Sequence, residues 1–135
     1  MKTLLFLSIL ITSPAQAENL TRGEMVKVLN SKTIQVKDGV GKKYILNLYC
    51  LANTKLTPKQ QAQGVEFLAY KTKGKVLIWN QTKAARVMVN GVENLSLKAL
   101  EWGILPLDPK CTDELAQQAQ ELGKKRKIGI WDGKK

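Results

Sequence analysis

The sequence predicts an α+β, mainly β domain, built as a five-stranded barrel with three helices. Three stretches between residues 24 and 51 alternate apolar and polar side chains with a period of two, which is typical of half-buried strands. A helical pattern follows at 57–74, and two further strand patterns lie at 76–79 and 86–89. Two helical patterns complete the chain, so the expected order is three strands, a helix, two strands and two helices.

The first three strands are expected to form a meander. The first covers residues 24–29 and the second 33–37, with a short Asn30-Ser31-Lys32 break between them. Asp38-Gly39 then signals a turn, because this dipeptide tolerates the backbone angles of tight hairpins. The third strand is expected over 44–51, and no helical pattern separates the three.

The first helix is expected to begin after Thr57. The Thr57 side chain can cap the first turn, and Pro58 suits the first helical position because proline lacks only a donor that would be unpaired there. Apolar residues recur on one helical face between 62 and 69, and Gly74 is a natural C-terminal stop. Gly64, in the middle of this helix, disfavours it by about 1 kcal/mol relative to alanine.

The second half of the chain predicts two strands and two helices. The strands are expected at 76–79 and 86–89, followed by a short helix at 95–102 that ends at Gly103. We expect Thr112 to cap the last helix. That helix has acidic residues in its first turn and basic residues at its end, an arrangement that complements the helix dipole.

The composition excludes several kinds of site. The 135 residues include 22 Lys plus Arg, 11 Asp plus Glu, two cysteines and no histidine, for a formal net charge of +11. Without histidine there is no Ser-His-Asp or Cys-His catalysis and no HExxH zinc site. Two cysteines cannot build a four-thiolate zinc site or an iron–sulfur cage. No cofactor is expected, and any metal would have to be a hard cation bound by carboxylates, which are few.

Residues 1–17 are expected to be a signal peptide. Lys2 supplies the positive start, an apolar run covers 4–11, and Ala15-Gln16-Ala17 has the small-x-small pattern of a cleavage site. The alternative is a transmembrane anchor, but the run is shorter than the roughly 20 residues needed to span a bilayer. Residues 18–135 would then form one exported domain, periplasmic or secreted, with no transmembrane segment after cleavage.

Export changes the expectation for the two cysteines. Cys50 and Cys111 would meet an oxidising environment, and one disulfide between them is the plain expectation. Closing a loop of about 60 residues is worth roughly 4 kcal/mol in the chain-entropy model. The alternative is one buried thiol and one exposed thiol that could pair between molecules.

The expected element order is that of the OB-fold, a five-stranded barrel with a helix between strands three and four. Several segments also carry a family pattern. Residues 28–36 look like the opening V-x-D-G-D-T-x-x-V, and 46–55 lie where that family has V-R-L-x-G-I-D-x-P-E. The second half of the family pattern is matched by Asn90-Gly91, the helix at 95–102, Gly103 and the closing stretch at 127–131. The chain resembles the staphylococcal nuclease-like (thermonuclease-like) family over about residues 24–131.

The resemblance implies a fold whose catalytic residues have been replaced. The family cleaves nucleic acid with calcium held by aspartates, two arginines on the phosphate and a glutamate that assists the water. The second arginine has no matching segment, and Arg86 is expected inside strand five, so that role is not assigned to it. At the other matching positions this chain has Asn30 and Lys32 for two aspartates, Asn47 for the first arginine, Ala52 for a further aspartate and Lys55 for the glutamate.

The shortage of acidic residues therefore predicts a pseudo-nuclease with no catalytic and no metal-binding residues. Between Glu24 and Glu66 the only acidic residue is Asp38, in a turn, whereas calcium needs several oxygen ligands. Ammonium groups at the matching positions would repel a divalent cation. Lys32, Asn47 and Lys55 become candidate anion-binding residues instead. The alternative is that they are merely exposed residues of a disused groove.

The expected function is a non-catalytic binding or assembly module. Its partner would be an envelope or secreted protein, or a polyanion such as nucleic acid held by non-specific, salt-sensitive attraction. Most aromatic residues lie on apolar-patterned faces, so few are expected to be free to stack on bases. The alternative function is an active calcium-dependent nuclease with a rearranged site.

Overall fold

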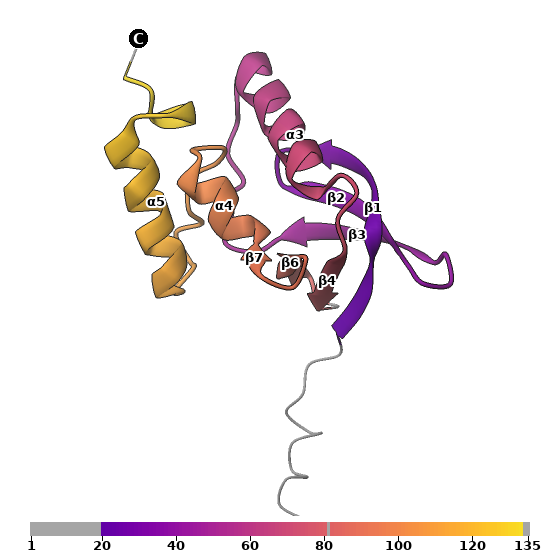
Figure 1. Cartoon of the computed structure of the whole chain (residues 1–135). Helices are drawn as coiled ribbons and strands as arrows, with labels where there is room; N and C mark the ends of the chain where they lie inside the picture. The colour runs from indigo at the N-terminus through magenta and orange to yellow at the C-terminus, as the bar shows by residue number, and fades with distance from the viewer. Residues whose placement is uncertain (1–19, 81, 134–135) are drawn as a thin grey trace, which may run out of the picture.

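The structure is a computed structural model that describes residues 20–80 and 82–133 (Figure 1). The expected signal peptide at 1–17 lies outside the described residues. The elements of the described chain are β1 (Leu20–Asn30), β2 (Thr33–Asp38), β3 (Lys43–Leu48), α3 (Pro58–Thr72), β4 (Leu77–Asn80), β5 (Ala84–Ala85), β6 (Val87–Val89), β7 (Glu93–Asn94), α4 (Leu95–Glu101), α5 (Glu114–Arg126) and the 3-10 helix η1 (Gly129–Trp131).

The strands form one mixed sheet in the order β5-β3-β2-β1-β4-β6-β7. Neighbours pair antiparallel except β3 and β5, which pair parallel. The α+β class is confirmed, but the closed barrel of five strands is wrong, because the described chain has an open sheet of seven. β6 corresponds to the expected fifth strand at 86–89, whereas β5, which precedes it, and β7, which follows it, were not expected. β5 pairs with β3 and β6 pairs with β4. Since Arg86 alone joins β5 at one edge to β6 near the other, the sheet is strongly curled.

Most strand boundaries differ from the expectation by a few residues, and β1 begins at Leu20 rather than at residue 24. Two of the differences have local reasons. β3 ends at Leu48 rather than near residue 51, because Cys50 takes a positive φ of 64°, which interrupts the extended backbone. The last helix is capped by Asp113 rather than Thr112, since the Asp113 side chain accepts a hydrogen bond from the Leu115 amide. The α3 start is confirmed, with Thr57 as a capping-box N-cap.

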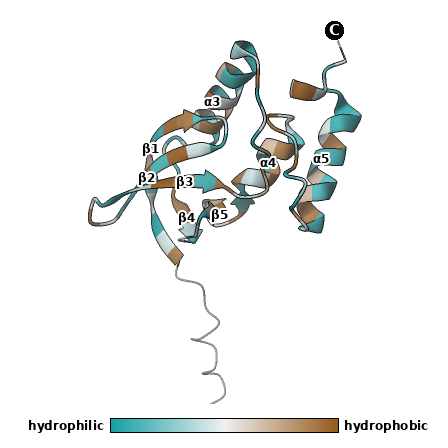
Figure 2. Cartoon of the chain, turned by 180° about the vertical axis from the view of Figure 1, so that it is seen from behind, coloured by the Kyte–Doolittle hydropathy of each residue, from teal (hydrophilic) through white to brown (hydrophobic). Residues whose placement is uncertain are grey.

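The core lies between the curled sheet and the two helices α3 and α4. It includes Trp79 of β4, Leu68 of α3 and Leu100 of α4, all without exposed surface. α5 is mostly hydrophilic and lies beside α4, where the buried Ala116 joins the core (Figures 1 and 2). The C-terminal helix is therefore held by a narrow apolar contact and by its two ends.

Two glycines fasten the closing Gly-Ile-Trp segment to the end of α4. Gly103 and Gly129 have φ values of +67° and +60°, and a Cβ on either would overlap a backbone carbonyl of the other segment. The Ile130 amide donates to the Gly103 carbonyl at 2.8 Å. Gly123 of α5 packs against α4, because a Cβ there would lie 2.8 Å from the Leu100 carbonyl oxygen and 3.1 Å from that of Glu101.

Gly64 brings α3 close to the β1–β2 turn, so its replacement by alanine is predicted to destabilise the fold. A Cβ at this position would lie 2.5 Å from the Ser31 Oγ and 3.0 Å from the Ile104 Cγ2. Helix propensity alone predicts a gain of about 1 kcal/mol for Gly64→Ala. Because overpacking typically costs about 1–3 kcal/mol, we expect a net loss in urea unfolding.

The matched control is Gln63→Ala, an alanine at the exposed neighbouring position of the same helix. It should leave the free energy of unfolding within about 0.5 kcal/mol of the wild type. Stabilisation by Gly64→Ala would show that α3 does not need this close approach.

Candidate functional site

A polar groove of about 450 Å³ lies where the β1–β2 turn, the end of β3 and the start of α3 meet. The turn contributes Asn30 to Thr33, in which the Asn30 Oδ1 accepts a hydrogen bond from the Lys32 amide at 2.9 Å. The Lys32 carbonyl in turn accepts from the Leu48 amide at 2.8 Å, which ties the turn to β3. The other lining residues are Asn47, Ala52, Asn53, Thr54, Leu56, Gln61 and Leu105.

Two side-chain hydrogen bonds orient the groove's amides. The buried Ser31 hydroxyl donates to the Gln61 Oε1 at 2.7 Å, and the Thr33 hydroxyl donates to the Asn47 Oδ1 at 2.9 Å. Both amides thereby use their acceptor oxygens. Their NH₂ groups make no hydrogen bond within the described part of the chain, so donors remain available.

Lys32 is the only charged residue among those that line this groove. The residue is half-buried, and its ammonium has no ion pair or hydrogen bond with any residue in 20–80 or 82–133. One cation and several spare donors suit an anion such as phosphate. The structure thus places Lys32 and Asn47 together with Ala52. Lys55 is exposed on the adjoining loop and is not one of the lining residues.

The residues of the groove do not fit calcium. Calcium takes six to eight oxygen ligands, usually including carboxylates, and no Asp or Glu lines the groove. Throughout the described ranges, no group of three Asp, Glu, His or Cys side chains is close enough to hold a metal ion. The groove offers donors and a cation, but it lacks a carboxylate to activate water.

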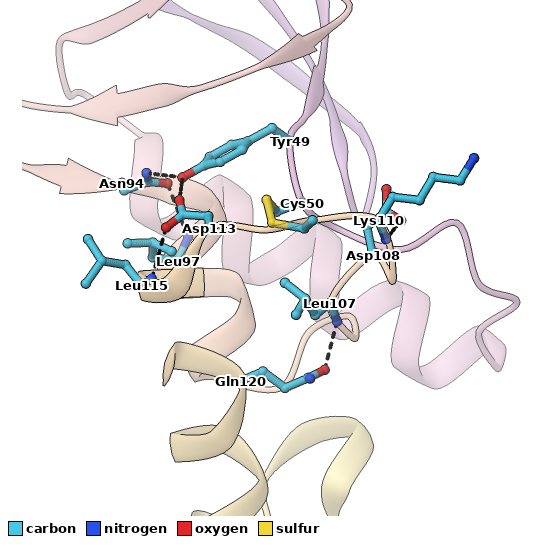
Figure 3. The surroundings of a disulfide bond; sticks show 11 residues. Tyr49, Cys50, Asn94, Leu97, Leu107, Asp108, Lys110, Asp113, Leu115 and Gln120 are labelled. Carbon is cyan, nitrogen blue, oxygen red and sulfur yellow. Dashed lines mark hydrogen bonds between the residues drawn. A yellow bond between two sulfur atoms is a disulfide. The ribbon is translucent and has the colours of Figure 1, made fainter. Parts of the chain in front are cut away.

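A second polar cluster lies on the other side of the Tyr49-Cys50 turn (Figure 3). The Tyr49 hydroxyl donates to the Asp113 Oδ2 at 2.9 Å and accepts from the Asn94 Nδ2 at 2.8 Å. Asn94 and Asp113 are the N-caps of α4 and α5. The Arg86 guanidinium lies 4.8 Å from the centre of the Tyr49 ring. One phenol therefore joins the end of β3 to the starts of two helices.

The hydrogen bond between Tyr49 and Asp113 shifts both titrations. Donation by the Tyr49 hydroxyl lowers the pKa of Asp113; partial burial opposes this, and the Arg86 charge assists it. Burial raises the pKa of Tyr49; the Arg86 and Asn94 side chains oppose this, and the Asp113 carboxylate adds to it. The cluster is thus a neutral phenol bonded to an ionised carboxylate at neutral pH.

Sequence reasoning missed this cluster. Tyr49 fell within an expected strand, and Arg86 was expected inside strand five, whereas it lies between β5 and β6. The four residues are far apart in the chain and follow no motif. The one local signal in the sequence is the N-cap of the last helix. It is expected at Thr112, whereas the structure has Asp113 as the cap.

The expected disulfide is confirmed: Cys50 and Cys111 are bonded, with a Cα–Cα distance of 5.2 Å. Backbone contacts support the same junction, since the Asp108 amide donates to the Cys50 carbonyl at 2.9 Å and the Ala52 amide to the Pro106 carbonyl at 2.9 Å. The loop that carries Ala52 is thereby held against the segment before α5.

Comparison with known proteins does not assign the chain. It matches no family model and no curated protein. No helix among the described residues is both long and apolar enough to cross a membrane.

The disulfide is predicted to contribute roughly 4 kcal/mol to stability, because it closes a loop between residues 61 positions apart. Cys50→Ala combined with Cys111→Ala should lower the free energy of urea unfolding by about that amount. The wild type should lose a similar amount when reductant is added, while the double variant should not respond. Equal stability of oxidised and reduced wild type would contradict this role.

Tyr49→Phe is predicted to destabilise the protein at neutral pH and less in acid. Removing both hydrogen bonds of the phenol should cost about 1–3 kcal/mol. The pKa of Asp113 is lower in the folded protein than in the unfolded chain. Its ionised carboxylate therefore contributes fully to the free energy of unfolding above the ordinary pKa of Asp. That contribution is lost as the pH falls through the pKa of Asp113 in the folded protein. The destabilisation caused by Tyr49→Phe should therefore become smaller below about pH 3.9.

Urea unfolding of wild type and variant over a pH series measures this difference. The control is Tyr70→Phe, which removes an exposed phenol with no hydrogen bond to a described residue. If Tyr49→Phe lowers the free energy of unfolding by the same amount at neutral and acid pH, the Tyr49 hydroxyl does not donate to an ionised Asp113 carboxylate.

Proposed function

We propose that this chain is an exported, catalytically inactive module of the staphylococcal nuclease-like kind that binds a phosphate-bearing polyanion, such as nucleic acid, in the groove around Lys32. The observation that carries the proposal is the groove itself. Its only charge is an ammonium without a partner among the described residues, and its Asn47 and Gln61 amides keep their donors. A fixed cation with amide donors favours phosphate oxygens.

The geometry also supports the position-by-position resemblance. Lys32, Asn47 and Ala52 match three catalytic positions of that family, and all three line one groove. Residues from the β1–β2 turn, β3 and the following loop meet there, as a family active site would require. Lys55, the match for the glutamate, lies on the same loop but outside the lining, so its contribution is long-range attraction.

The net charge of +11 supports a polyanionic partner over a neutral one. Attraction of this kind is sensitive to salt and insensitive to sequence, because it acts on phosphates. The disulfide supports export, since such bonds persist in oxidising compartments. In this proposal residues 1–17 direct export, residues 18–135 are the mature domain, and assembly with an envelope protein is a role that the same module could serve.

The rival function is a calcium-dependent nuclease with a rearranged site. It would need carboxylates brought together from segments that the described structure keeps apart. We predict no cleavage of single-stranded or double-stranded DNA by the purified mature chain with millimolar calcium. Digestion that a chelator abolishes would overturn the pseudo-nuclease proposal.

Polyanion binding is predicted to depend on Lys32. We expect Lys32→Glu to weaken binding of a labelled single-stranded DNA by about tenfold at low salt and to reduce the salt slope by about 1, measured by fluorescence anisotropy over a salt series. The matched control is Lys43→Glu, the same charge change at the other end of β3. Equal losses from the two variants would show a diffuse charge effect and no groove site.

A further inference from the structure

A second hollow, apolar and separate from the groove, lies between α3, the end of α4 and η1. It has a volume of about 530 Å³. Figure 1 shows α3, α4 and the C-terminal segment that surround it. We define the aromatic hollow by Phe67 and Tyr70 of α3, Trp102 and Ile104 after α4, and Ile128 before η1. None of these residues lines the groove around Lys32.

Much of this apolar lining is exposed to water. Tyr70 is 79% exposed and Trp102 is 46% exposed, although both are large aromatic residues. Phe67 and Ile128 are half-buried, and Ile104 is buried beneath them. Tyr, Trp and Arg are the residues most enriched at the energetic centres of protein interfaces, and the Arg126 guanidinium lies 5.9 Å from the Trp102 ring centre. Clustered apolar exposure of this type marks interaction sites.

The chemistry around the aromatic hollow is basic. The Arg126 guanidinium lies beside the Trp102 ring, and the exposed Lys127 directly precedes Ile128. Lys124 and Lys125 line a different hollow on α5. Glu66 is the only charged residue in the lining. Glu101, beside Trp102, is paired with Arg126 at 3.4 Å. A partner should therefore present an apolar side chain for the hollow and acidic residues for the basic segment next to it.

We propose that the aromatic hollow binds an acidic protein segment that inserts an aliphatic or aromatic side chain between Tyr70 and Trp102. A nucleobase fits less well, because part of its polar edge would be desolvated against Ile104 and Ile128. A second copy of this chain fits less well, because two strongly basic chains repel each other. This site is independent of the groove around Lys32.

A peptide-display selection tests the proposal without assuming a sequence. Random twelve-residue peptides are selected on the disulfide-bonded mature chain, with counter-selection on Tyr70→Ala. We expect enriched peptides to carry two or more acidic residues beside a Leu, Ile, Phe or Trp. An enriched peptide should bind Tyr70→Ala and Trp102→Ala at least tenfold more weakly than the wild type by isothermal titration.

The matched control is Val92→Ala, which trims a 77% exposed apolar residue elsewhere. It should leave peptide affinity unchanged. Since Tyr70 is mostly exposed, Tyr70→Ala should stay folded even if Trp102→Ala does not. Enriched peptides without acidic residues, or equal affinity for Tyr70→Ala, would overturn the proposal. So would Tyr70-dependent binding of oligo(dT), or a Tyr70-dependent dimer in sedimentation.

Discussion

The structure depends on the anchoring of one two-residue turn, Tyr49-Cys50, at the end of β3. Cys50 holds a positive φ that non-glycine residues rarely adopt, and its disulfide and backbone carbonyl bind it to the segment before α5. Tyr49 bonds the N-caps of α4 and α5 from the same turn. The mostly hydrophilic α5, which has a narrow apolar contact with the core, is therefore positioned by covalent and polar contacts at its N-terminal end.

The same turn determines the shape of the groove. Asn47 lies just before it and Ala52 just after it, so the anchor sets the distance between the end of β3 and the loop that leads to α3. On the opposite side, Gly64 lets α3 approach Ser31, and the Ser31 hydroxyl then orients Gln61. A groove of fixed shape is thus lined by oriented amides and one ammonium. Under the proposed resemblance, a carboxylate would stand at the position of Lys32 and an arginine at that of Asn47.

Local patterns predicted most of the elements, because alternation, capping and glycine stops act over a few residues. Thr57 and Pro58 defined the start of α3, and the two cysteines suggested the bond that is present. The open sheet of seven strands was not predictable from local patterns. β5 pairs with β3 and β6 pairs with β4, and these pairings depend on residues distant in the chain. Lys32 and Asn47 meet in the groove, whereas Lys55 lies just outside it. The Tyr49 cluster and the aromatic hollow join residues far apart in the chain, so no local pattern could reveal them.

Binding of an anion without calcium is the central claim, and side-chain NMR tests it most directly. The uniformly ¹⁵N-labelled mature chain would be titrated with a short phosphodiester oligonucleotide, first with chelator and then with calcium. The predicted result is that the side-chain NH₂ signals of Asn47 and Gln61 shift with chelator present and do not change further when calcium is added. Shifts that appear only with calcium, or shifts confined to residues outside the groove, would contradict the claim.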